Sequence, residues 1–143
     1  MEIAHNKQTW KGFFTYYEGY EPFKKCIQVD FDMQISFDED SFTGICSDSE
    51  SKHIFEKPAD VKGFIDEEKI SFIKNYPCLY YKDEDGKIML DRELKHPEIH
   101  YLGYFNENKR NISGTWEMVV YERKHLDYYL EEVISGEFEM KRI

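Results

Sequence analysis

The segment CIQVDFDMQISF, residues 26–37, alternates between apolar and polar side chains without interruption. Successive side chains of a β-strand point to opposite faces of the sheet, so this pattern predicts a strand with one apolar and one polar face. We expect the odd-numbered side chains, from Ile27 to Phe37, to join the core, and the even-numbered ones, including Asp30 and Asp32, to face water. A slip of one residue would bury both aspartates, so the alternation also fixes the register of the strand.

Shorter stretches of the same kind follow along most of the chain. We expect further strands over residues 9–17, 42–48, 61–65, 69–76, 78–82, 98–105 and 112–122, with turns or polar connections between them. Residues 87–94 and 126–133 fit either a strand or a short helical segment, and we favour strands. The polar segment 49–60 contains Pro58, which predicts a loop.

The composition supports an all-β fold. Aromatic residues make up 17% of the chain, and large aromatic side chains favour pleated sheets over helices. About eight to ten strands joined by short turns predict antiparallel neighbours in chain order. An up-and-down meander that closes into a β-barrel removes both open edges of such a sheet, so this is our leading architecture, with a two-sheet sandwich as the alternative. We expect one domain over residues 1–143.

Charge and cysteine content exclude several function classes. The formal net charge of −10, without a basic cluster, argues against nucleic acid and anionic membranes as partners. Cys26, Cys46 and Cys78 show neither a disulfide framework nor a metal-binding spacing, so we expect three reduced thiols. No targeting segment and no apolar stretch of membrane-spanning length is evident, and we therefore expect a cytoplasmic protein.

Several of these strands resemble those of the calycins, the superfamily of lipocalins, fatty-acid-binding proteins and avidins. Trp10 and Gly12 lie on the first expected strand and Lys141-Arg142 ends the last, which is similar to the aromatic and basic closure of calycin barrels. The successive segments ISFIKNY, HYLGYF and ISGTWE also look like the strand pattern of small lipocalin-like barrels. The resemblance implies a calycin-like barrel and transfers no activity.

The interior of such a barrel offers a candidate ligand site. A barrel of eight strands is wide enough to be filled by side chains or to hold one small ligand. Tyr76, Tyr101 and Trp116 would give flat walls with polar groups, and Lys74, on the same apolar face as Tyr76, would need a carboxylate or an anionic ligand. Two alternatives stay open: the aromatic residues fill the core, and Lys74 pairs with an internal Asp or reaches the barrel mouth.

Other candidate chemistry is weaker. Asp30 and Asp32 could form an acid/base pair if they faced inward, although polar faces of antiparallel sheets are usually solvated. His96 and His100 are four residues apart, but Pro97 argues against a helix that would bring them to one metal ion. A haem-binding barrel could use one axial histidine, and nothing in the sequence selects one. No nucleophile motif or phosphate-binding loop occurs, so no cofactor is assigned.

Three hypotheses follow. The first is a barrel that binds a small apolar or aromatic ligand, with an anionic ligand as one option, through Lys74, Tyr76, Tyr101 and Trp116. The second is a filled barrel that acts as a structural or interaction protein and forms a homo-oligomer through surplus aromatic residues such as Tyr80, Tyr81, Tyr128 and Tyr129. The third is an enzyme that uses Asp30 and Asp32.

Overall fold

The computed structural model describes residues 7–19, 22–125 and 128–143, with the side chains of residues 121–131 left out. Ten strands and no helix form in this part of the chain. The strands are β1 (Lys7–Glu18), β2 (Lys25–Asp38), β3 (Ser41–Asp48), β4 (Ala59–Asp66), β5 (Lys69–Asn75), β6 (Leu79–Lys82), β7 (Ile88–Asp91), β8 (Ile99–Phe105), β9 (Asn111–His125) and β10 (Tyr128–Arg142). The described residues therefore also contain no helix that could cross a membrane.

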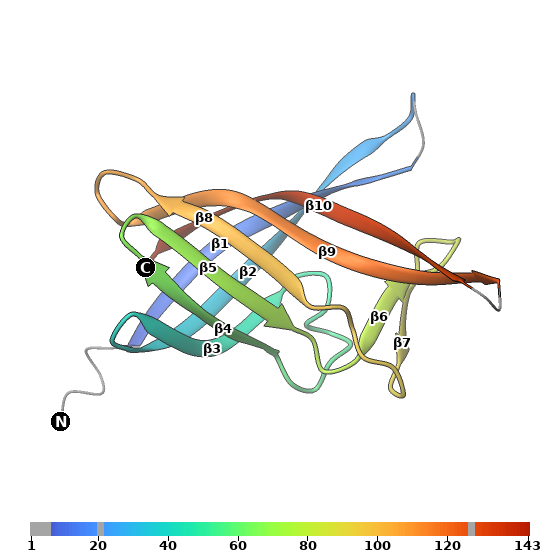
Figure 1. The fold of residues 1–143 in the computed structure, drawn as a ribbon, viewed down its shortest axis with the longest axis horizontal. Helices are drawn as coiled ribbons and strands as arrows, with labels where there is room; N and C mark the ends of the chain where they lie inside the picture. The colour runs from blue at the N-terminus through green and yellow to red at the C-terminus, as the bar shows by residue number, and fades with distance from the viewer. Residues whose placement is uncertain (1–6, 20–21, 126–127) are drawn as a thin grey trace.

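Eight of these strands close into a barrel in the order β1-β10-β9-β8-β5-β4-β3-β2. Neighbouring strands are antiparallel, and each barrel strand pairs with the next barrel strand along the chain (Figure 1). The barrel closes where residues 10–14 of β1 pair with residues 138–142 of β10, which places Trp10 opposite Arg142. The predicted antiparallel meander barrel is confirmed, and the sandwich alternative is wrong.

The β6–β7 hairpin stands outside the barrel as a separate two-stranded sheet between β5 and β8 in the chain. Figure 1 shows it at one end of the barrel, the end towards which β9 and β10 extend. Residues 88–91, for which a helix was the alternative, form strand β7, and β10 includes residues 128–133 as strand. The hairpin consequently covers one mouth of the barrel instead of contributing to its wall.

The predicted faces of β2 are confirmed. Val29, Phe31 and Met33 are buried in the barrel, whereas Asp30 and Asp32 lie exposed on its outer surface. Asp32 forms a surface ion pair with Lys11 on β1 at 3.6 Å. The two carboxylates proposed for an enzyme therefore do not face the interior.

The middle of the barrel is packed with aromatic side chains. The rings of Phe72 and Tyr101, on the paired strands β5 and β8, are stacked with their centroids 4.6 Å apart. Phe138 of β10 packs edge-on against both rings. This cluster fills the barrel between its two ends, so any space for a ligand must lie towards a mouth.

Burial should make the three free thiols react differently. Cys26 is exposed on β2, whereas Cys46 and Cys78 are buried, and burial raises the pKa of the Cys46 thiol to about 11. We expect a disulfide reagent such as Ellman's reagent to modify Cys26 rapidly in the native protein and the other two thiols only after unfolding. The Cys26→Ser variant should lack the rapid phase, and a rapid phase that persists in this variant would contradict the described burial.

Candidate ligand-binding site

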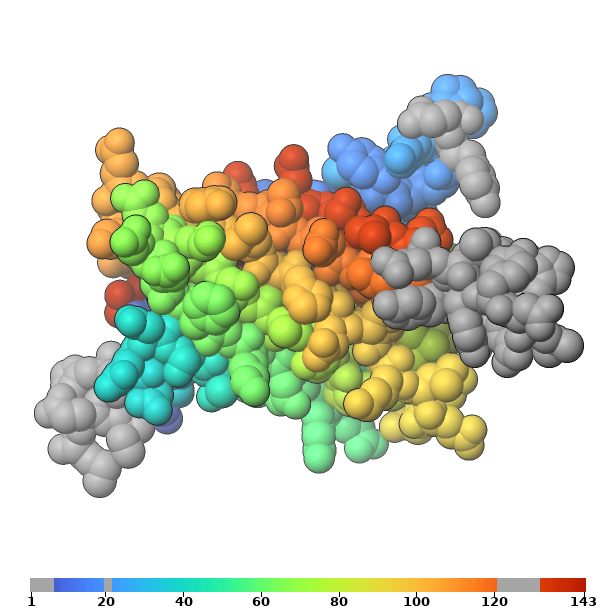
Figure 2. Space-filling view, in the orientation of Figure 1, coloured from blue at the N-terminus to red at the C-terminus, as the bar shows by residue number. Residues whose placement is uncertain are grey.

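A cavity of about 430 Å³ opens at the mouth that the β6–β7 hairpin covers. We call it the mouth cavity. Figure 2 shows that the hairpin (yellow) and the far end of the β1–β2 ribbon (blue) lie at the same end of the molecule, away from the β2–β3 turn (cyan). Most residues that line the mouth cavity are aromatic or aliphatic: Phe14, Tyr16, Tyr17, Tyr76, Leu79, Tyr80, Tyr81, His96, Pro97, Ile99, Tyr101, Trp116, Met118, Val120 and Ile134. The remaining lining residues are Glu18, Glu50 and Lys82.

Trp116 forms a wall of the mouth cavity and also joins two strands. The β1–β10 ladder ends at the pair Phe14 and Phe138, and just beyond it the Trp116 indole N–H donates to the carbonyl of Thr15 on β1 at 2.9 Å. Trp116 lies on β9, so its side chain crosses β10 at Gly136, which pairs with it. A Cβ atom at Gly136 would collide with the Thr15 carbonyl and the indole. The lack of a side chain at Gly136 therefore allows the Trp116 indole to cross β10, and the indole N–H already has its acceptor within the protein.

A hydrogen-bonded cluster lies at the rim of the mouth cavity. The Lys82 ammonium on β6 donates to the Tyr16 hydroxyl at 2.6 Å and to Glu18 at 3.2 Å. Glu50 accepts from the hydroxyls of Tyr16 and Tyr80 at 2.6 and 3.2 Å. The Lys82 and Glu50 charges are 3.5 Å apart. Burial and the Glu50 carboxylate raise the pKa of Tyr16 to about 12, so the hydroxyl stays protonated and can donate.

Asp48, at the end of β3, fixes the loop that carries Glu50. One oxygen of the buried carboxylate accepts hydrogen bonds from the Glu50 and Ser51 amides and the Ser51 hydroxyl at 2.7–3.1 Å. The other oxygen accepts a short hydrogen bond from the Tyr76 hydroxyl, at 2.5 Å. These bonds compensate for the burial of the carboxylate and set the position of the loop over the mouth.

Lys74 lies on the inner face of β5, as expected, and is 1% exposed. Its ammonium is 3.9 Å from Asp48 and lies over the rings of Phe14, Tyr76 and Tyr101, at 4.6, 4.8 and 5.3 Å from their centroids. No hydrogen-bond acceptor for Nζ is found among the described residues. Lys74 is not itself a lining residue of the mouth cavity, but all three of these rings are. It therefore lies one layer of side chains behind the cavity floor.

The charge of Lys74 is stabilised by its surroundings. Burial by itself lowers the pKa of the ammonium, but the neighbouring Tyr101, Cys46 and Asp48 raise it, and the net pKa lies above the ordinary value for lysine. Burial also raises the pKa values of Tyr101 and Cys46, so both groups are uncharged near neutral pH. Asp48 is thus the charge that balances Lys74.

His96 contributes an acceptor to the cavity wall. Its Nδ1 is 2.9 Å from the carbonyl of Pro97, which fits a tautomer in which Nδ1–H donates and Nε2 is free to accept. The ring stacks on Tyr80 and packs edge-on against Tyr76. Burial lowers the pKa of the imidazole, and the Lys74 charge lowers it further, whereas the Pro97 carbonyl and Asp48 act in the opposite direction. His96 is consequently neutral at pH 7.

The structure brings the four predicted site residues to one end of the barrel. Tyr76, Tyr101 and Trp116 line the mouth cavity, and Lys74 contacts the first two from behind. His96 was singled out only as a loop histidine, and His100 is exposed on the outside of β8, so the two do not meet. No cluster of potential metal ligands occurs in the part of the chain that the structure describes.

Sequence reasoning did not assign Asp48, Glu50, Tyr16 or Lys82 to the site. A signal existed for Asp48, because it follows Phe42 and Cys46 on the inner face of β3 and so had to point into the barrel. Glu50 and Lys82 gave no such signal, since a charged residue in a polar loop or a short hairpin is normally solvated. Tyr80 was considered for oligomer contacts, and the structure places it in the cavity wall. The side chains of Tyr128 and Tyr129 lie outside the described residues.

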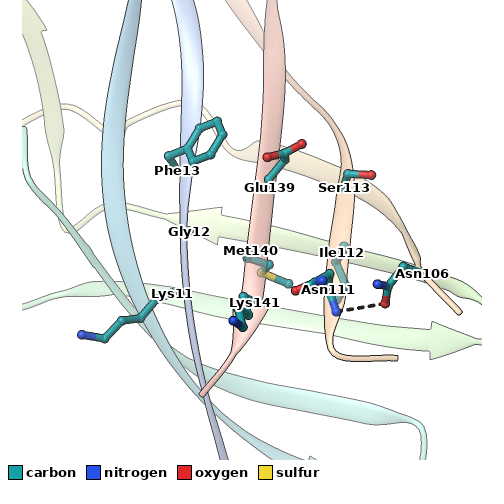
Figure 3. Close-up of a pocket in the computed structure, with 10 residues that line it drawn as sticks. All are labelled: Lys11, Gly12, Phe13, Asn106, Asn111, Ile112, Ser113, Glu139, Met140 and Lys141. Carbon is teal, nitrogen blue, oxygen red and sulfur yellow. Dashed lines mark hydrogen bonds between the residues drawn. The ribbon is translucent and has the colours of Figure 1, made fainter. Parts of the chain in front are cut away.

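A second hollow, also of about 430 Å³, lies on the outside of the barrel over β1, β9 and β10 (Figure 3). Lys11, Ser113 and Glu139 in its lining are exposed. The backbone N–H of Asn111 donates to the side-chain oxygen of Asn106 at 3.1 Å. It lacks the enclosing aromatic walls of the mouth cavity. We therefore regard the mouth cavity as the candidate site.

No model of a protein family matches this chain, and no curated protein is a match.

Filling the space over Gly136 should displace the Trp116 indole. We expect Gly136→Ala to lower the free energy of unfolding by about 1–3 kcal/mol, the usual cost of overpacking a buried site, in urea titrations. Ser135→Ala, an exposed neighbour on β10, is the matched control and should change little. Equal free energies of unfolding for the two variants would show that an alanine at position 136 does not displace the Trp116 indole.

His96 should make the stability of the protein depend on pH below neutrality. Its pKa in the folded protein lies below the ordinary 6.5, so the unfolded chain takes up this proton first as the pH falls. The stabilisation is complete above pH 6.5 and is lost towards pH 5, by at most about 1.4 kcal/mol per pH unit. We expect His96→Gln to flatten the curve of unfolding free energy against pH between 7 and 5, and His100→Gln, which changes an exposed histidine, is the matched control. Parallel curves for wild type and His96→Gln would exclude this contribution.

Proposed function

We propose that the protein binds a small, flat, largely apolar molecule in the mouth cavity. The observation that carries this proposal is the lining: a cavity of about 430 Å³ whose walls come from the aromatic rings of Phe14, Tyr76, Tyr80, Tyr101 and Trp116. Ligand sites in proteins are typically clefts of about 300–1,000 Å³ with mainly apolar walls and a few polar groups. The volume and the lining both fall within that description.

The shape of the site supports a ligand over a filled barrel. The middle of the barrel is packed by Phe72, Tyr101 and Phe138, yet the mouth above it keeps open space although large side chains surround it. Rings held by other contacts cannot turn inward to fill the space: the indole of Trp116 is bonded to Thr15, and Tyr76 is bonded to Asp48. The walls are thus held in place before a ligand arrives, which lowers the cost of ordering the site on binding.

A calycin-like fold is part of the proposal. The closed antiparallel meander agrees with it, as does the pairing of Trp10 on the first strand with Arg142 on the last. The segments ISFIKNY, HYLGYF and ISGTWE resemble strands of calycin barrels, which bind ligands in the mouth and interior of the barrel. The β6–β7 hairpin and the loop that carries Glu50 would then act as the cover of that mouth, tied to β1 through Tyr16.

The proposal can be tested with dimethylaminonaphthalene, an uncharged, flat fluorescent molecule. We expect saturable binding of one molecule per chain, measured by probe fluorescence and by titration calorimetry. Met118→Trp replaces a flexible side chain of the cavity wall with a large ring, and it should weaken binding at least about tenfold, equivalent to about 1.4 kcal/mol. Glu117→Trp adds the same ring on the exposed side of β9 and is the matched control.

Binding that is absent in the wild-type protein, or that Met118→Trp and Glu117→Trp affect equally, would contradict the proposed site. Unfolding curves of both variants separate a blocked cavity from a misfolded protein.

A further inference from the structure

The buried ammonium of Lys74 meets no acceptor with full hydrogen-bond geometry among the described residues. Its Nζ has three N–H donors and is 1% exposed, and the Tyr101 hydroxyl is close enough to raise its pKa but does not meet that geometry. Buried polar groups in native proteins are nearly always hydrogen-bonded, and a charged donor without a partner is especially costly. A group that the described residues do not provide should therefore occupy a position beside Nζ.

Asp48 does not fill this position. Its carboxylate is 3.9 Å from Nζ, which gives a charge interaction, but both of its oxygens already accept hydrogen bonds from other groups. Moving the carboxylate towards Lys74 would break the bonds that hold the Ser51 turn and the Tyr76 hydroxyl. The ion pair thus balances the charge of Lys74 and leaves its N–H donors free.

The charges around the cavity restrict what can bind there. Lys74 and Asp48 cancel, so an anion beside Nζ would leave an uncompensated buried negative charge next to Asp48. An anion would also pass Glu18 and Glu50, which outnumber Lys82 at the rim. A cation is disfavoured as well, because the Lys74 ammonium already occupies the faces of Phe14, Tyr76 and Tyr101. An uncharged acceptor meets neither obstacle.

The position of Lys74 fits an acceptor at the inner end of a ligand. The three rings over which Nζ lies all line the mouth cavity, so these rings are the layer of side chains between the ammonium and the cavity. A hydrogen bond to a ligand therefore requires the flexible four-carbon chain of Lys74 to turn an N–H between these rings.

We propose that the ligand of the mouth cavity is an uncharged aromatic molecule that carries a carbonyl-type acceptor, and that this acceptor receives a hydrogen bond from Lys74. The inference rests on the proposed function and adds to it the chemical class of the ligand and its orientation, with the carbonyl end innermost.

Three probes with one ring system test the inference. They are dimethylaminonaphthalene without a further group, prodan, in which the same skeleton carries a propionyl ketone, and the naphthoate in which a carboxylate replaces the ketone. A hydrogen bond to a charged group should make wild-type protein bind prodan about tenfold or more tightly than the ketone-free probe. The naphthoate should bind more weakly than prodan.

Variants assign the effect to Lys74. Lys74→Met would leave Asp48 buried without its counter-charge, so it is combined with Asp48→Asn, which keeps an amide that can bond to Ser51 and Tyr76. In the double variant, we expect the preference for prodan over the ketone-free probe to disappear and the emission of bound prodan to move to shorter wavelength. Lys69→Met, which changes an exposed lysine on the same strand, is the matched control and should keep the preference.

The outcomes separate this inference from the proposed function. Equal binding of all three probes, or a preference for prodan that survives in the double variant, overturns the role of Lys74 and leaves the cavity as a binding site. Tightest binding of the naphthoate overturns the uncharged ligand class. A crystal structure with prodan in which only a water contacts Nζ also overturns the inference. Failure of every probe to bind counts against the proposed function itself. The ranking in wild-type protein needs no variant, so the test holds even if the double variant does not fold.

Discussion

The buried carboxylate of Asp48 is the interaction on which the candidate site depends. It stands at the end of β3, inside the barrel, and bonds to the Ser51 turn, the Tyr76 hydroxyl and, through charge, Lys74. Two buried charges are tolerated in an aromatic interior because they balance each other and because the carboxylate is fully hydrogen-bonded. Through these bonds one residue sets the position of a loop, a cavity wall and an ammonium behind the cavity floor.

Closure of the barrel accounts for the position of the cavity. Residues 10–14 of β1 pair with β10, and beyond Phe14 the ladder stops. At this point the Trp116 indole joins β9 to β1 by crossing Gly136, and Thr15 of β1 also hydrogen-bonds to Glu137 of β10. The mouth cavity lies beside this crossing, with residues of β1, β6 and β9 in its lining. The packed middle and the open mouth thus meet where the β1–β10 ladder ends.

The predicted site shows which residues a local sequence pattern can place and which it cannot. The alternation over residues 69–76 placed Lys74 and Tyr76 on the inner face of β5, and the structure confirms that placement. An internal Asp was one of the alternatives for the partner of Lys74, but the sequence could not say which Asp, because the pairing of β3, β4 and β5 brings Asp48 to it. Lys82 and Glu50 join Tyr16 from a hairpin and a loop whose paths leave no periodic signal in the sequence.

The sequence by itself determined most of the strands and the inner and outer faces of β2 and β5, and it favoured a closed antiparallel meander over a sandwich. Side-chain alternation is a property of a single strand with a period of two, so it can be read without knowing the neighbours. Only the tertiary structure decided that β6 and β7 form a separate sheet, that the Trp116 indole N–H donates to the Thr15 carbonyl, and that His96 lines the cavity. These features depend on contacts between residues that are far apart in the chain, and barrel closure and the loop paths fix such contacts jointly.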